Sequence, residues 1–83
     1  MLSITNLSDL GRSFRMERKA MGKTQAQVAK DALLRRETII RIEAGENTDA
    51  MTLLKAISAL GKAITITSSR PGYEELKKTF NED

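Results

Sequence analysis

Basic side chains are concentrated between positions 12 and 41 of this 83-residue chain. The span carries nine arginine and lysine residues against three acidic ones, a net charge of +6, whereas the whole chain carries only +3. This asymmetry favours a polyanionic partner, because arginine and lysine neutralise phosphate groups. A basic cluster alone is more typical of a solvated helical surface, so its meaning depends on how the chain positions it. The nine residues are Arg12, Arg15, Arg18, Lys19, Lys23, Lys30, Arg35, Arg36 and Arg41.

The absent residue types exclude much catalytic chemistry. The sequence has no cysteine and no histidine, which excludes disulfide bonds, thiolate zinc sites, cysteine nucleophiles and imidazole bases. It also lacks a glycine-rich phosphate loop and a pair of inward-facing carboxylates. We therefore expect no enzyme activity, no cofactor and no metal site. No apolar run approaches the roughly 20 residues of a membrane helix, so we expect no membrane association and a cytoplasmic, nucleoid-associated protein.

Apolar spacing and end signals predict four helices that must position these side chains, over residues 7–21, 25–32, 36–44 and 50–60. Gly22, Gly45 and Gly61 are expected to end the first, third and fourth of them. The expected N-caps are Ser8 or Asn6, Thr24 and Asp49. The apolar residues expected to face inward are Leu7, Leu10, Phe14, Met21, Val28, Ala29, Ile39, Ile42, Leu53, Leu54, Ile57 and Leu60.

Two opposite charges lie on apolar stripes that otherwise face the core. Arg18 shares a face of the first predicted helix with Phe14, and Glu43 shares one of the third with Ile39 and Ile42. A buried charge needs a partner, so we predict a structural ion pair between Arg18 and Glu43 rather than a catalytic group. Breaking one side of such a pair costs roughly 3–5 kcal/mol when it is fully buried.

The segment Ala63–Thr67 is rich in β-branched residues that alternate between apolar and polar, which predicts a β-strand. A lone strand cannot satisfy its own backbone groups. We expect Ile64, Thr65 and Ile66 to pair with the same strand of a second copy across a two-fold axis. The chain then divides into a helical domain over residues 1–61, a dimerising strand over 62–68 and a tail or short helix over 69–83.

The middle of the chain resembles the XRE (phage-repressor-like) helix-turn-helix family. The similarity covers about residues 7–61 and is carried by three segments, L-G-R-S-F-R-M-E-R-K-A-M-G, T-Q-A-Q-V-A-K-D-A-L-L-R-R-E-T-I-I-R-I-E-A-G and T-L-L-K-A-I-S-A-L-G. The strand and the following R-P-x-Y-E-E-L resemble the HipB-like branch, whose members pair with kinase-like toxins. The resemblance implies a mainly α, four-to-five-helix repressor-like domain with one C-terminal β-strand that pairs across a homodimer.

Two positions depart from the family pattern. Leu33 stands where the turn between the second and third helices usually has glycine, and a left-handed conformation costs a non-glycine residue roughly 1–2 kcal/mol. Arg35 replaces the usual serine or threonine cap, with a loss of about 1 kcal/mol. We expect a slightly strained turn, which leaves the angle of the third helix open.

If the third helix enters the major groove, its outward residues read bases. Arg36 and Arg41 could each make a bidentate contact to guanine O6 and N7, or contact phosphates, or be solvated. Glu37 could accept from cytosine N4, although a surface pair with Arg41, four residues on, is the simpler expectation. Ile40 could contact a thymine methyl group or pack within the fold. The predicted base contacts are Arg36, Glu37, Ile40 and Arg41.

Phosphate contacts are expected where the second helix begins, because free N–H groups and the helix dipole favour an anion there. The resemblance implies that Gln25 touches DNA. The Thr24 side chain either contacts a phosphate or caps the second helix, and capping is the simpler expectation. Glu46 and Asp49 put acidic groups in a loop that usually lies near the DNA backbone. The predicted phosphate contacts are Lys23, Thr24, Gln25, Arg35 and Asn47.

These residues predict a homodimer that binds a pseudo-palindromic operator in double-stranded DNA and represses transcription. The HipB-like tail favours the antitoxin of a toxin–antitoxin operon, which represses its own operon and binds a kinase-like toxin protein. Two alternatives are a stand-alone phage-like regulator and a protein-interaction module that has lost DNA binding.

Overall fold

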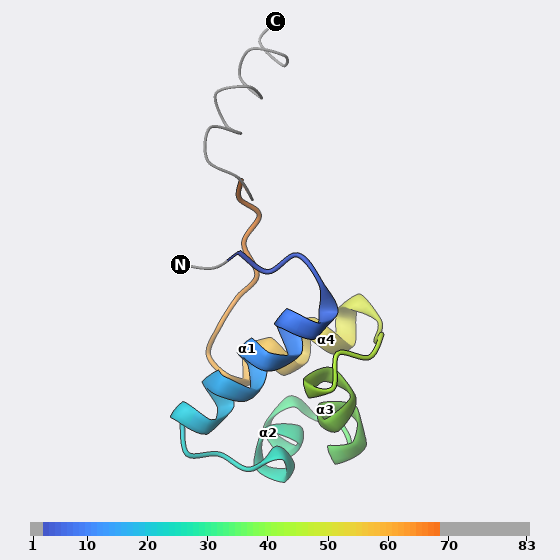
Figure 1. Cartoon of the computed structure of the whole chain (residues 1–83). Coiled ribbons are helices and arrows are strands. Elements are labelled where there is room, and N and C mark those ends of the chain that lie inside the picture. Colours follow the sequence, from blue (N-terminus) through green and yellow to red (C-terminus); the bar gives the residue numbers. More distant parts are fainter. Residues whose placement is uncertain (1–2, 69–83) are drawn as a thin grey trace, which may run out of the picture.

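Four helices form the protein in a computed structural model that describes residues 3–68 (Figure 1). They are α1 (Leu7–Ala20), α2 (Gln25–Ala32), α3 (Arg36–Glu43) and α4 (Ala50–Ala59). The mainly α, helix-turn-helix prediction is therefore confirmed, and α1, α3 and α4 each end one residue earlier than predicted. The predicted tail or short helix at 69–83 lies outside the described residues.

Side-chain caps define where three of the helices begin. The Asp9 backbone N–H donates to Asn6 Oδ1 at 2.8 Å, so Asn6 rather than Ser8 caps α1. Thr24 caps α2, and the Asp49 carboxylate accepts from the Thr52 backbone N–H at 2.7 Å to cap α4. α3 has no side-chain cap at Arg35, as the sequence predicted.

The core lies where α2, α3 and α4 meet beneath α1. Val28 of α2 and Ile39 of α3 are fully buried at its centre. Aliphatic and alanine side chains surround them with a single aromatic ring, so burial of apolar surface holds the four short helices together. The other core residues are Phe14, Ala29, Ile42, Ala56, Ile57 and Leu60, and Leu10, Leu34, Leu53 and Ala59 pack against them.

Three residues that were expected to face inward are instead exposed. Leu7 is the first residue of α1 and Met21 its C-cap, so both lie beyond the part of α1 that packs on the core. Leu54 is 46% exposed. It lies about 100° around α4 from Leu53, off the face that Ile57 shares with the core. The sequence prediction was wrong for these three residues because it extended apolar stripes to helix ends and neighbouring faces.

A glycine allows α1 and α3 to approach closely. A Cβ atom at Gly11 would lie 2.5 Å from the Ile42 carbonyl oxygen and 2.7 Å from that of Glu43. No side chain fits at this distance, so the contact requires glycine. The close approach sets the position of the C-terminal end of α3, where Glu43 lies, against α1.

The chain leaves the helices in an extended segment over residues 62–68, drawn in orange in Figure 1, and residues 62–67 of it are exposed. Residues 3–68 contain no β-strand, and Ile64 and Ile66 are 52% and 97% exposed. Within the described residues this segment forms no strand pairing, so pairing across a homodimer stays a prediction. None of the helices in this described range is both long and apolar enough to cross a membrane.

Candidate nucleic-acid interface

One side of α3 faces solvent and carries the residues expected to read bases. At 100° per residue, Arg36, Glu37, Ile40 and Arg41 fall within one arc of about 140°, and all four are exposed. The opposite side holds the two core residues of this helix, Ile39 and Ile42. Ile40, at 40% exposure, therefore belongs to the outer surface and not to the core.

The two arginines of this surface have no ionic partner in the described part of the chain. The alternative pairing of Glu37 with Arg41 along the helix is not formed there. Arg36, at the first position of α3, and Arg41, in its last turn, thus keep their guanidinium donors available. Each guanidinium can donate two parallel hydrogen bonds to a planar acceptor pair, which is the arrangement that guanine offers in the major groove.

The turn between α2 and α3 forms without glycine. Leu33 adopts φ 58° and ψ 40°, the left-handed conformation that the sequence predicted for it. Its backbone N–H donates to the Lys30 carbonyl at 3.1 Å, and the Leu34 N–H donates to the Ala29 carbonyl at 2.8 Å. The Leu33 side chain is 89% exposed and packs on nothing that offsets the strain. The hydrogen bonds of the turn, together with the burial of its neighbours, hold it in place.

Thr24 has a capping role that leaves its hydroxyl proton available. Its Oγ1 accepts from the Gln27 backbone N–H at 3.1 Å, while Gln27 Oε1 accepts from the Thr24 N–H at 2.8 Å. A hydroxyl that accepts one bond can still donate its own proton. The backbone N–H groups of Gln25 and Ala26 donate to no acceptor among residues 3–68. Three donors thus point outward where α2 begins.

The other predicted phosphate contacts lie in different places. Lys23 is paired with Asp31 at 2.8 Å on the surface; such exposed pairs contribute at most about 1 kcal/mol, so a phosphate can compete for this lysine. Arg35 is exposed in the turn before α3. Asn47 is exposed beyond the other end of α3. Because an eight-residue helix is about 12 Å long, Asn47 and Arg35 cannot bind one phosphate.

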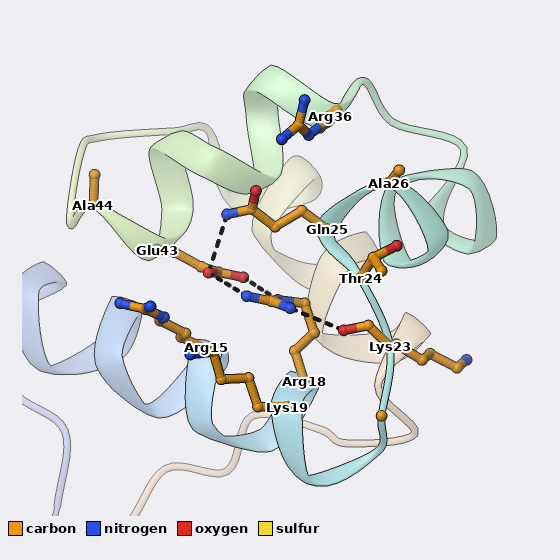
Figure 2. A pocket seen from close by; sticks show the side chains of 11 residues that line it. Arg15, Arg18, Lys19, Lys23, Thr24, Gln25, Ala26, Arg36, Glu43 and Ala44 are labelled. Carbon is orange, nitrogen blue, oxygen red and sulfur yellow. Dashed lines mark hydrogen bonds and ion pairs between the residues drawn. The ribbon is translucent and has the colours of Figure 1, made fainter.

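Behind this surface, Arg18 and Glu43 form the predicted ion pair (Figure 2). Arg18 Nε donates to Glu43 Oε2 at 2.6 Å and Nη2 to Oε1 at 3.0 Å, and their side chains are only 9% and 6% exposed. Arg18 Nη1 also donates to the Lys23 carbonyl at 2.8 Å. The hydrogen bonds to Glu43 raise the pKa of Arg18 above its ordinary value, more than burial lowers it.

The ion pair also holds a residue of the expected DNA interface. Gln25 Nε2 donates to Glu43 Oε1 at 3.3 Å, as the dashed lines in Figure 2 show. The carboxylate of α3 therefore binds α1 through Arg18 and the first residue of α2 through Gln25. This arrangement fixes the direction of the Gln25 amide and leaves its second N–H and its carbonyl oxygen for a ligand.

Above this network an open groove with a volume of about 930 Å³ separates α1 from the start of the helix-turn-helix. Arg15 and Lys19 line it from α1, and neither was predicted from the sequence to belong to the site. Both follow directly after buried positions, Phe14 and Arg18, so they flank the core-facing side of α1. The complete lining is Arg15, Arg18, Lys19, Gly22, Lys23, Thr24, Gln25, Ala26, Arg36, Glu43 and Ala44.

Comparison with known proteins agrees with this geometry. A family model described as helix-turn-helix matches residues 14–66. A comparison with curated protein sequences gives no match.

Solved structures of HipB share the fold. One, in a HipA-HipB-O2-O3 complex, has a TM-score of 0.78 at 24% identity and covers 84% of this chain and 100% of its own. A HipB variant in complex with an O2 20-mer has a TM-score of 0.78 at 25% identity and covers 84% and 99%. A HipB complex with an O4 20-mer has a TM-score of 0.78 at 24% identity and covers 84% of this chain and 100% of its own. Since the family model covers more than half of the chain, the protein belongs to the XRE-type helix-turn-helix family, a family of DNA-binding regulators and not of enzymes.

Proposed function

We propose that this protein binds a specific operator in double-stranded DNA through α3 and represses transcription. The observation that carries the proposal is the outer surface of α3, where two arginines without an ionic partner in the described chain flank an exposed isoleucine. A helix with this surface fits the major groove, in which each base pair presents its own pattern of donors, acceptors and methyl groups.

Each side chain of this surface has a distinct task in the proposal. Arg36 and Arg41 donate to guanine O6 and N7, and Ile40 contacts a thymine methyl group. Glu37, which forms no ion pair with Arg41 in the described chain, accepts a hydrogen bond from cytosine N4. A correct bidentate contact contributes about 1–3 kcal/mol of discrimination against a wrong base. These four residues therefore determine the operator sequence.

Phosphate contacts around this surface fix the protein's position on the duplex. Thr24 and Gln25 offer hydroxyl, amide and backbone donors at the start of α2. Arg35 and Asn47 lie before and after α3, where the two phosphate backbones that border the major groove would pass. Lys23 can exchange its ion pair with Asp31 for one with a phosphate. Such contacts make affinity salt-dependent without making it sequence-dependent.

The protein acts as a homodimer in this proposal. Ile64, Thr65 and Ile66 of each copy pair as antiparallel strands, which gives their exposed backbone groups and apolar side chains a partner. A two-fold dimer places two recognition helices one helical turn apart, roughly 34 Å, and therefore requires a pseudo-palindromic operator.

The regulatory role that we favour is that of an antitoxin which represses its own operon and binds a kinase-like toxin. The support is the similarity to a HipB solved together with HipA and O2-O3, with the resemblance of residues 70–76 to the HipB-like branch. The gene beside this one is a simple discriminator, because a kinase-like reading frame there favours the antitoxin over a stand-alone regulator. Co-purification of the two gene products tests the complex directly, and failure to recover one contradicts it.

DNA binding is tested with the full chain by fluorescence anisotropy. The protein is first used to select duplexes from a genomic fragment pool, and affinity is then measured against a scrambled duplex. We expect Arg36→Ala and Arg41→Ala to abolish the preference for the selected duplex. Arg12→Ala, which removes an arginine paired with Asp9 on α1, is the matched control and should retain it. Selection of no duplex by the wild-type protein would refute the proposal.

A protein-interaction module without DNA binding was the other alternative. Its support is the acidic loop at Glu46 and Asp49, which would repel DNA, together with the irregular turn at Leu33. In the structure the Asp49 carboxylate caps α4 by accepting the Thr52 N–H, so this acidic residue has a structural role in the fold. If Arg36→Ala and Arg41→Ala left the regulatory function intact, the module would be the correct alternative.

A further inference from the structure

The groove between α1 and the start of the helix-turn-helix carries positive charge that the described residues do not neutralise. Its single lining carboxylate, Glu43, already accepts two hydrogen bonds from Arg18 and one from Gln25. No second acidic residue lines the groove. The lining cations that form no ion pair within residues 3–68 are Arg15, Lys19 and Arg36.

The basic residues of α1 differ in whether they line the groove. Arg12 lies on the same face one turn before Arg15, does not line the groove and is paired with Asp9. Arg15 and Lys19, which line the groove, have no such partner in the described chain, although both are exposed. They are four residues apart, so their Cβ atoms lie about 5–6 Å from each other on one helix face. Two adjacent cations facing a groove without a counterion indicate an anionic ligand from outside.

The opposite wall of the groove supplies hydrogen-bond donors. Thr24, Gln25 and Ala26 all line it. The Thr24 hydroxyl proton and the backbone N–H groups of Gln25 and Ala26 have no acceptor among the described residues. Figure 2 shows these residues across the groove from Arg15 and Lys19. Cations on one wall and neutral donors on the other match a phosphodiester, whose oxygens accept both kinds of bond.

We propose that this groove binds the sugar–phosphate backbone of duplex DNA, with Arg15 and Lys19 of α1 as phosphate contacts. The assignment rests on the proposed function and extends the interface from two helices to three. The groove is open to solvent, and its lining includes Arg36, the first residue of α3. The DNA backbone that borders the major groove occupied by α3 lies next to Arg36 and can therefore extend into this groove. A small ligand would instead favour a site that buries most of its surface.

The salt dependence of binding measures the number of these contacts. Each phosphate contact contributes about −0.9 to the slope of log K against log salt. If affinities converge at 1 M salt, one lost contact weakens binding about eightfold at 0.1 M salt by the same relation. Arg15→Ala and Lys19→Ala should each reduce the slope by about 0.9 per protomer bound, and the double variant by about twice as much. The loss should be equal for all sequences, because phosphates carry no base identity.

The experiment titrates full-length protein against a labelled selected duplex and a scrambled duplex at several salt concentrations. Arg12→Ala removes the same charge from the same helix outside the groove, so it should leave the slope unchanged, and circular dichroism melts verify that every variant is folded. Unchanged slopes for Arg15→Ala and Lys19→Ala, or a loss as large for Arg12→Ala, would overturn the inference. The scrambled duplex separates the two proposals: without any preference for the selected duplex the proposed function fails, yet the slope still tests the groove.

Discussion

Removing one partner of the buried Arg18–Glu43 ion pair should destabilise the protein strongly. Glu43→Leu leaves the Arg18 guanidinium, whose side chain is 9% exposed, with only the Lys23 carbonyl as acceptor. Arg18→Met leaves the Glu43 carboxylate with only the Gln25 amide at 3.3 Å. An unpaired buried charge costs about 3–5 kcal/mol. The total stability expected for 83 residues is about 4–12 kcal/mol, so either substitution removes a large part of it.

The double variant distinguishes this explanation from a loss of packing. With both charges replaced by apolar side chains of similar volume, no charge stays buried, and the exchange is often neutral or stabilising. The Lys23 carbonyl loses its hydrogen bond from Arg18, which costs about 1 kcal/mol. We therefore expect the double variant to lie within about 2 kcal/mol of the wild type and to be more stable than either single variant.

Urea unfolding followed by far-ultraviolet circular dichroism measures all four proteins, because the helices supply the signal and the sequence has no tryptophan. The coupling energy is the difference between the double variant and the sum of the single ones. Single variants that cost less than about 1 kcal/mol, or a double variant whose cost equals their sum, would refute the reasoning. The first result would mean that water reaches the pair, and the second that each side chain stabilises the protein through other contacts.

Three further changes test other parts of the structure by the same unfolding measurement. Gly11→Ala places a Cβ against two backbone carbonyls of α3 and should cost about 1–3 kcal/mol; an unchanged stability would show that α1 can shift freely. Leu33→Gly removes left-handed strain of roughly 1–2 kcal/mol against a glycine entropy cost of about 0.5–1 kcal/mol, so stability should rise slightly, and a fall would mean that the exposed leucine packs. The hydrogen bond from the Thr52 N–H lowers the pKa of Asp49, so its stabilisation is present above the pKa of the unfolded chain and lost as the pH falls through the folded value. Asp49→Asn keeps the cap and should make the free energy of unfolding less dependent on pH in the acidic range. If the pH dependence did not change, it would have to come from other carboxylates.

The sequence predicts those features that depend on neighbours along the chain. The capping residues and glycines placed the helix boundaries to within a residue or two, and the left-handed Leu33 followed from its position in the motif. Arg18 and Glu43 could be paired because each was the only charge on its apolar stripe. A helical pattern therefore predicts contacts wherever a single charged residue interrupts a core-facing surface.

Features that depend on the packing of whole helices were not predictable in the same way. Leu54 has the same residue type as its buried neighbours, and only the orientation of α4 determines that it is exposed. Arg15 and Lys19 belong to the groove because α1 approaches α3 through Gly11, and the periodicity of α1 alone does not show which helix lies beside them. The pairing of residues 63–67 depends on a second copy and lies outside what one chain determines.

The exposed segment over residues 63–67 has a consequence for how long the protein survives in a cell. Extended backbone without internal hydrogen bonds is the form of chain that proteases bind and cleave. In the proposed dimer this backbone is paired, whereas in a monomer it is accessible. Association by mass action raises the protected fraction as the protein accumulates. The degradation rate per molecule should then fall as the amount of protein rises, and a culture that produces little of it would lose it soon after synthesis stops.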